Sequence, residues 1–360
     1  MLEISLFCLI LAILVFPIIF KSVEKHLEIF LFAAGALSVT LPHFFGGSDL
    51  WTPQLVIDAF KEPLSITAVI LAAGALLTIF DSAINRLILK IERILGLRLF
   101  LSLLIVALGL FSSVFTAIVC AIILAEVVDG LALNENYRTK IVILGCFSIG
   151  LGAVLTPLGE PLGVICIAKL KTSPYNAGFF FLFKTLYAYV LPGIFLMGLA
   201  GFIARPEKAG NGAEGSAPVN RGLRDLFGYA LRVYVFIMAL VFLGTGLKPV
   251  VDSYIIKLPD IALYWINMVS AFLDNATLAA AEISPAMTLP QLKHIIMGLL
   301  ISGGMLIPGN VPNIICAKRL NIKSRQWARI GAPLGLALMV LCFAVFCLGK
   351  ACMNLPHNIP

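Results

Sequence analysis

Residues 152–170 read GAVLTPLGEPLGVICIAKL, and residues 303–320 read GGMLIPGNVPNIICAKRL. Each stretch begins with glycine, carries two prolines four residues apart, continues to Ile-Cys and then reaches a basic residue. The prolines are Pro157 and Pro161 in the first copy and Pro308 and Pro312 in the second. Two prolines in one apolar segment remove two backbone donors, so each copy predicts a helix that is broken midway.

The surrounding sequence is apolar enough to be embedded in a lipid bilayer. Of its 360 residues, 60% are hydrophobic and 12% are charged, whereas soluble domains carry about 25% charged residues. Stretches of the length that spans a bilayer recur at 2–20, 27–45, 64–81, 141–168, 178–204, 229–247, 295–317 and 330–350. The sequence therefore predicts an all-α polytopic membrane protein with about eight transmembrane helices and excludes a soluble fold.

Two further apolar stretches, 99–128 and 255–283, are too long for one span and too short for two. Both have polar residues near the middle, namely Ser112, Ser113 and Thr116 in the first and Ser270, Asp274, Asn275 and Thr277 in the second. Non-helical backbone at membrane depth is tolerated only inside protein or along a wet cavity. Each stretch is therefore predicted to form a re-entrant hairpin.

The basic residues indicate how the chain is oriented. With eight spans that cross and two hairpins that return to their own side, most of the 26 Lys and Arg residues fall on one face. The positive-inside rule makes that face cytoplasmic, which places both termini outside. The net charge of +7 is thus explained by membrane orientation, and no nucleic-acid partner is expected.

The two proline-bearing segments then run in opposite directions, each after its own hairpin. Inverted repeats with broken helices are typical of secondary transporters, whose binding sites lie at the breaks. The predicted domains are N-terminal scaffold helices at 1–98, ending in an amphipathic surface helix at 82–98, repeat 1 at 99–204, a linker at 205–228 and repeat 2 at 229–350.

Asp274 is the leading candidate for an ion site. A carboxylate at membrane depth is costly and usually serves a transport pathway or pairs with a charge, and no Lys or Arg occurs within the ten residues after it. A desolvated carboxylate can exchange a proton for a metal ion near neutral pH. Asn275 and Thr277 add neutral oxygens that suit a hard cation, so Asp274 is predicted to bind Na⁺.

Glu160 is the second candidate, either as a ligand or proton carrier or as a solvated group at the outer mouth. Aligning the prolines makes Val311 its counterpart in the second copy. Hydroxyls and amides at the breaks and hairpins complete the predicted site: Ser112, Ser113, Thr116, Thr156, Asn310 and Asn313. The four histidines, His26, His43, His294 and His357, have no metal-ligand spacing and are expected at the surface.

The run SAFLDNATLAAAEI at 270–283, followed by SGGMLIPGNVPNIICAKRL at 302–320, resembles the second repeat of the ion transporter superfamily. The chain is similar there to a family of uncharacterised prokaryotic cation transporters related to NhaD-type sodium/proton antiporters. Arsenite and di- or tricarboxylate transporters are more distant. The resemblance runs from about residue 60 onward. It implies a multi-pass protein of the prokaryotic inner membrane, a scaffold that forms a homodimer, and a transport domain that moves like an elevator.

Three functions compete on the sequence. Antiport of Na⁺ or Li⁺ against protons fits an intramembrane carboxylate among neutral oxygens. A transporter of small carboxylates or oxyanions would need cationic ligands or exposed helix N-termini, and neither hairpin has an Arg at its middle. An intramembrane hydrolase would need a second aspartate near Asp274, or a His or Lys near Ser112.

The sequence favours the cation antiporter over the other two functions. A nucleotide-binding G-x-x-x-x-G-K-[ST] motif is absent, so direct drive by ATP within this chain is not expected. For a transporter of this kind we expect neither enzymatic activity nor a cofactor. The expected partners are the bilayer, a monovalent cation, a proton and a second copy of the chain.

Overall fold

The computed structural model is all-helical over the residues that it describes. These are 1–20, 22–23, 26–45, 49–64, 67–68, 71–72, 94–131, 133–171, 173–205, 223–250, 253–254, 257–272 and 275–353. Four of its helices are long and apolar enough to cross a membrane: Glu28–Phe45, Leu97–Phe115, Phe181–Ile203 and Ser324–Gly349. The prediction of an all-helical fold is confirmed, and the four long apolar helices are consistent with a membrane protein. Asp274 and most of the segments 64–81 and 82–98 lie outside the described residues.

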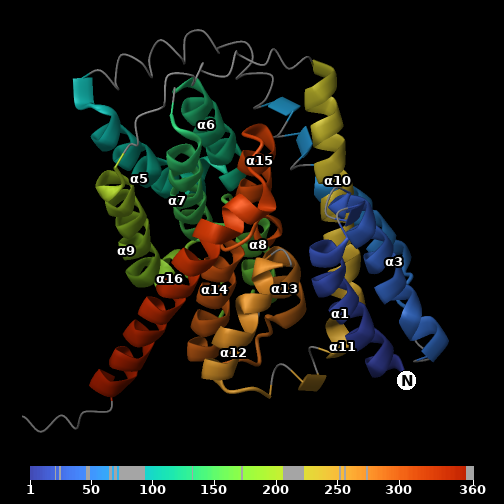
Figure 1. Ribbon diagram of the computed structural model, residues 1–360. Coiled ribbons are helices and arrows are strands. Elements are labelled where there is room, and N and C mark those ends of the chain that lie inside the picture. The colour runs from blue at the N-terminus through green and yellow to red at the C-terminus, as the bar shows by residue number, and fades with distance from the viewer. Residues whose placement is uncertain are drawn as a thin grey trace, which may run out of the picture.

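The helices form two groups that lie side by side in Figure 1. The smaller group contains α1 (Leu2–Ile19), α3 (Leu27–Phe45), α10 (Leu223–Gly246) and α11 (Lys248–Val250) around a core of its own. The helix α10 corresponds to the span at 229–247 that was predicted to begin repeat 2. It nevertheless packs along α3, in the smaller group. It also begins inside the predicted linker. The contact is close, because a Cβ on Gly35 would stand only 2.9 Å from the carbonyl oxygen of Ala239.

The larger group begins with the first hairpin segment, which forms α5 (Leu97–Phe115) and α6 (Ala117–Gly130). Thr116 separates the two helices with a φ of 73°, and its hydroxyl caps α6 by accepting a hydrogen bond from the backbone N–H of Val119. The broken helix follows as α7 (Glu135–Ala153), the first break at 154–160, and α8 (Pro161–Lys169). The repeat closes with α9 (Phe181–Ile203).

Repeat 2 contains the corresponding elements in the same order. The second hairpin segment comprises α12 (Asp260–Ile266), the 3₁₀ helix η2 (Asn267–Ala271) and α13 (Asn275–Glu282). The second broken helix comprises α14 (Leu289–Gly303), the second break at 304–310, which includes η3 (Ile307–Gly309), and α15 (Val311–Arg319). The long α16 (Ser324–Met353) follows. Both predicted broken helices are therefore present.

Backbone geometry shows that the two breaks are copies of one motif. Glu160 caps α8 with φ −156° and ψ 161°, and Asn310 caps α15 with φ −154° and ψ 146°. The carbonyl of each cap accepts the N–H three residues later at 3.1 Å. Both helices end in the same way, since Leu170 donates to the carbonyl of Cys166, and Leu320 to that of Cys316, each at 3.0 Å.

This geometry corrects the proline-based alignment, because the counterpart of Glu160 is Asn310 and not Val311. Pro161 is the first residue of α8, whereas Pro312 is the second residue of α15. The first N–H groups of a helix have no intrahelical acceptor, so proline is tolerated at either position. The spacing of the prolines therefore predicts where each helix is broken. It does not determine, to within one residue, where the next helix begins.

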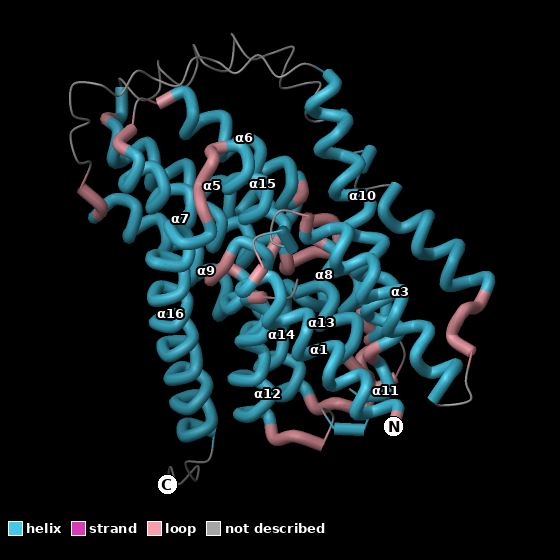
Figure 2. Tube along the Cα trace, turned by 45° about the vertical axis from the view of Figure 1, so that its right-hand side comes forward, coloured by secondary structure: helices cyan, strands magenta, loops and turns pink. Residues whose placement is uncertain are grey.

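The two broken helices run in opposite directions. At one end of the molecule, called here the Glu126 end, an ion pair joins Arg319 at the end of α15 to Glu126 of α6, and Gln326 donates to Glu135 at 2.6 Å. At the opposite end, the Met287 end, the hydroxyl of Tyr175 after α8 donates to the carbonyl of Met287 before α14. Figure 2 shows α6 and α15 in the upper half and α12 and α13 in the lower half.

His294 departs from its predicted place at the surface. It is buried in α14, its ring stacks on Phe346 with centroids 4.1 Å apart, and its Nδ1 lies 2.7 Å from the carbonyl oxygen of Pro290. The residues next to His294 in the sequence do not predict this contact, because Phe346 belongs to α16, which is distant in the sequence. His26 and His43 are exposed, as predicted, and His357 lies outside the described residues.

Candidate functional site

In repeat 1, the hairpin segment is fastened to the first break by three hydrogen bonds. The hydroxyl of Ser112 donates to the carbonyl of Ile149 at 3.0 Å, and the hydroxyl of Thr156 donates to the carbonyl of Ser113. The backbone N–H of Ala117 donates to the carbonyl of Gly159 at 2.7 Å. These bonds bring the predicted residues Ser112, Ser113 and Thr156 together, next to the half-buried Thr116.

Repeat 2 contains an equivalent arrangement. The hydroxyl of Ser270 donates to the carbonyl of Leu299 at 3.2 Å, in the same way as Ser112 bonds to Ile149. The amide nitrogen of Asn313 donates to the carbonyls of Gly303 and Leu306, at 2.8 and 2.9 Å, and so holds the second break in shape. Its Oδ1 remains buried with no hydrogen-bond partner among the described residues.

The two repeats meet at α7. A Cβ on Gly150 would stand 2.9 Å from the amide nitrogen of Asn310, so this cap of α15 lies one helical turn from the first break. The thiol of Cys146, one turn earlier, lies 3.7 Å from the carbonyl oxygen of Pro312. In addition, α6 packs on α15 and α8 packs on α13. Polar groups from both repeats thus share the middle of the larger group.

Of the three predicted site residues at 274–277, the structure describes only Asn275 with its side chain. Asn275 begins α13 and is buried, and its Nδ2 has no partner among the described residues. Thr277 belongs to the same helix, but its side chain is not described, and Asp274 lies outside the described residues. The roles of Asp274 and Thr277 therefore remain predictions from the sequence.

The buried charged side chains that the structure describes are acidic. Glu160 and Glu282 are buried, whereas none of the Lys and Arg side chains that the structure describes is buried. Glu282 is 3% exposed, and sequence reasoning missed it along with the buried Asn267. The available signal was a carboxylate within an apolar stretch, which at membrane depth marks a functional residue.

The donor set fits a hard cation better than a transition metal. Within the described ranges, no group of three or more His, Cys, Asp or Glu side chains could hold a metal ion. The polar groups at the two breaks and in the hairpin segments are carboxylate, hydroxyl, amide and backbone oxygens, which are the ligands that hard cations such as Na⁺ prefer.

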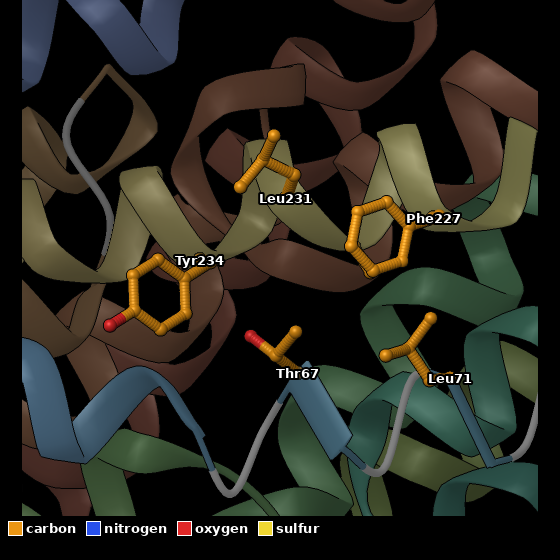
Figure 3. A pocket seen from close by; sticks show the side chains of 6 residues that line it. Thr67, Leu71, Phe227, Leu231 and Tyr234 are labelled. Atoms are coloured by element: carbon orange, nitrogen blue, oxygen red, sulfur yellow. The ribbon is translucent and has the colours of Figure 1, made fainter. Parts of the chain in front are cut away.

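An apolar pocket of about 200 Å³ lies elsewhere, between α10 and the residues Thr67 and Leu71. Figure 3 shows the ring of Phe227 and the side chains of Leu71, Leu231 and Tyr234 around it. It contains none of the predicted site residues and no buried charge, so it is not a candidate for ion binding.

Comparison with known proteins gives a family but no function. A search of curated proteins found no match. A family model described as "Protein of unknown function (DUF1646)" matches residues 3–348, nearly the whole chain. The chain therefore belongs to the DUF1646 family.

Proposed function

We propose that the chain is a secondary active transporter that exchanges Na⁺ or Li⁺ for protons across a prokaryotic inner membrane. In this proposal the two hairpin segments are re-entrant, about eight further helices span the bilayer, and both termini lie outside. Two copies form a homodimer. The proposal is based in part on the resemblance of the sequence to cation transporters of the ion transporter superfamily.

One observation carries most of the weight: Glu160 is buried at the first of the two antiparallel breaks, and Glu282 is buried at the end of α13. A desolvated carboxylate is stabilised by a bound cation or by a proton. A site of this kind therefore alternates between the two, which is the elementary step of cation/proton exchange.

The proposed cycle has Asp274 at its centre. From the cytoplasmic side, the deprotonated Asp274 binds Na⁺ with help from hydroxyl and amide oxygens of both repeats. The loaded transport domain then moves, Na⁺ leaves to the outside, and a proton takes its place. An empty, charged carboxylate is too costly to carry across the bilayer, which couples the two flows.

The moving part is proposed to be the larger helix group, which shifts against α1, α3, α10 and α11. Separate hydrophobic cores in the two groups support this division. Contact between them includes α13 resting on α10, with Leu278 and Ile314 packed against the smaller core. Because α13 follows Asp274 directly in the sequence, binding of Na⁺ at Asp274 is proposed to change the contact between α13 and α10.

The test uses purified protein in liposomes that contain a pH-sensitive dye. A pH gradient is imposed, and NaCl, LiCl, KCl or choline chloride is added in turn. We expect proton movement with Na⁺ or Li⁺ and none with choline. No response to any of these cations would reject the proposal.

Transport of a small anion is the second candidate, because four short helices, α6, α8, α13 and α15, begin at the hairpin segments and breaks. Helix N-termini favour anions. However, α8 begins at the carboxylate of Glu160, which would repel an anion there. Uptake of a carboxylate or oxyanion by the same liposomes, without a cation response, would favour this candidate.

Exchanging the two cap residues tests the role of Glu160. We expect Glu160→Gln to raise the Na⁺ concentration for half-maximal exchange roughly tenfold, equivalent to about 1.4 kcal/mol of lost binding. Because Asn310 is the structural counterpart, the double variant Glu160→Asn/Asn310→Glu returns a carboxylate to the shared region and should recover part of the affinity. Unchanged affinity in Glu160→Gln would assign Glu160 a structural role.

A further inference from the structure

Glu282 and Asn267 form a buried contact between the two halves of the second hairpin segment. Glu282, the last residue of α13, is 3% exposed, and the amide of Asn267, itself 1% exposed, donates a hydrogen bond to its carboxylate. The same amide nitrogen donates to the carbonyl of Leu263 at 2.9 Å. The backbone carbonyl of Asn267 accepts from the hydroxyl of Ser302 at 2.6 Å. Asn267 is therefore fixed to α12 and α14, and its amide holds the end of α13 against η2.

This pair lacks one hydrogen-bond donor. Oε2 of Glu282 and Oδ1 of Asn267 are buried and have no hydrogen-bond partner among the described residues. The amide nitrogen of Asn267 cannot serve them, because both of its N–H groups are already used. An ionised carboxylate has only acceptors, whereas a protonated one adds a single O–H donor. A proton on Oε2 would let Glu282 donate to Oδ1, which leaves neither atom without a partner.

No neighbouring base supplies the missing positive charge. The elements α8, α10, α14 and η2 pack against α13. Their described charged or titratable side chains are Cys166, Lys169, Arg232, Tyr234, Lys293 and His294. The environment of Glu282 is set by burial and by Asn267, with no Coulombic contribution from any of these groups. A buried carboxylate in this setting is costly, so a positively charged ligand would stabilise it.

The number of available oxygens favours a proton over a metal cation as this ligand. Hard cations such as Ca²⁺ and Mg²⁺ take about six or more oxygen ligands, whereas the pair offers only Oε2 and Oδ1 as unpartnered oxygens among the described residues. One O–H donor completes both of these atoms. A carboxylic acid and an amide can then pair through two hydrogen bonds that run in opposite directions.

We propose that Glu282 and Asn267 form a proton-binding acid–amide pair that closes the second hairpin segment when it is protonated. One proton taken from solution neutralises the carboxylate and adds a second hydrogen bond between α13 and η2. When the proton leaves, the charged carboxylate needs water, so the end of α13 separates from η2. This site depends on neither the exchange function proposed above nor the position of Asp274.

Hydrogen exchange of the full-length protein, measured by mass spectrometry, tests the closure. The proton is bound at acidic pH and lost as the pH rises, so the α13 amides of wild type should exchange about tenfold or more faster at alkaline pH after correction for the intrinsic rate. Glu282→Gln has an amide that can donate to Oδ1 at every pH, so its α13 should stay protected throughout. The matched control Glu135→Gln removes an exposed carboxyl and should behave as wild type.

Infrared difference spectra between acidic and alkaline pH test the binding of the proton itself. We expect wild type to show a component of the protonated-carboxyl band that Glu282→Gln lacks and Glu135→Gln keeps. A band that is unchanged in Glu282→Gln would overturn proton binding at this site. Failure of Glu282→Gln to fold would also contradict the pair, because glutamine can complete the same two hydrogen bonds.

The remaining outcomes concern the closure and the identity of the ligand. Equal pH dependence of α13 exchange in wild type and Glu282→Gln would overturn the closure. Protection of α13 at alkaline pH in NaCl but not in choline chloride would mean that a cation occupies the site, and would overturn the acid–amide pair. Neither measurement requires transport, so a failure of sodium/proton exchange in liposomes would not affect the result.

Discussion

Asp274→Asn is expected to reduce Na⁺-driven proton movement to the level of protein-free liposomes. The asparagine keeps the size of the side chain and one oxygen, but it can neither carry the negative charge that binds Na⁺ nor release a proton. Because the charge alternation is the coupling step, its loss removes exchange in both directions. The measurement is dye-reported proton flux after addition of NaCl or LiCl.

The variant also needs proof of folding. Asp274→Asn should elute from size exclusion as wild type does, since a neutral amide is cheaper to bury than a carboxylate. Asp49→Asn is the matched control, because it makes the same change at an exposed residue that follows α3 in the sequence and should leave exchange intact. Full exchange by Asp274→Asn would refute the proposed mechanism and move attention to Glu160 and Glu282.

Gly152→Ala is expected to destabilise the protein by about 2–3 kcal/mol. A Cβ at this position would stand 1.7 Å from the carbonyl oxygen of Gly109 and 2.7 Å from the hydroxyl of Ser112. The nearer atom is backbone, so a side-chain rotation cannot relieve the clash, and α5 must move away from α7. The apparent melting temperature in detergent, followed by size exclusion after heating, measures the effect.

A second glycine provides the control. Gly349 in α16 has open space around its Cβ position, so Gly349→Ala should leave stability unchanged or raise it slightly through helix propensity. Separating α5 from α7 would also disturb the bond from Ser112 to Ile149, so Gly152→Ala should lose transport before it loses its fold. Equal melting temperatures for the two variants would contradict the close packing of α5 on α7.

The sequence alone determined the membrane class, the two broken helices and the interruption of the first hairpin segment. These features are local: an apolar run spans a bilayer whatever surrounds it, and a proline removes a donor from its own helix. The break after Ala153 and the separation at Thr116 lie where the prolines and the polar residues predicted them.

Only the tertiary structure decided which residues of the two repeats correspond and which polar groups are buried. Proline is tolerated at the first or second position of a helix, so the backbone geometry of the two caps was needed to match Glu160 with Asn310. Packing of α10 on α3 and burial of Glu282 and His294 depend on contacts between distant segments. Such contacts reflect the shape and chemistry of both partners, and neither partner's sequence contains that information by itself.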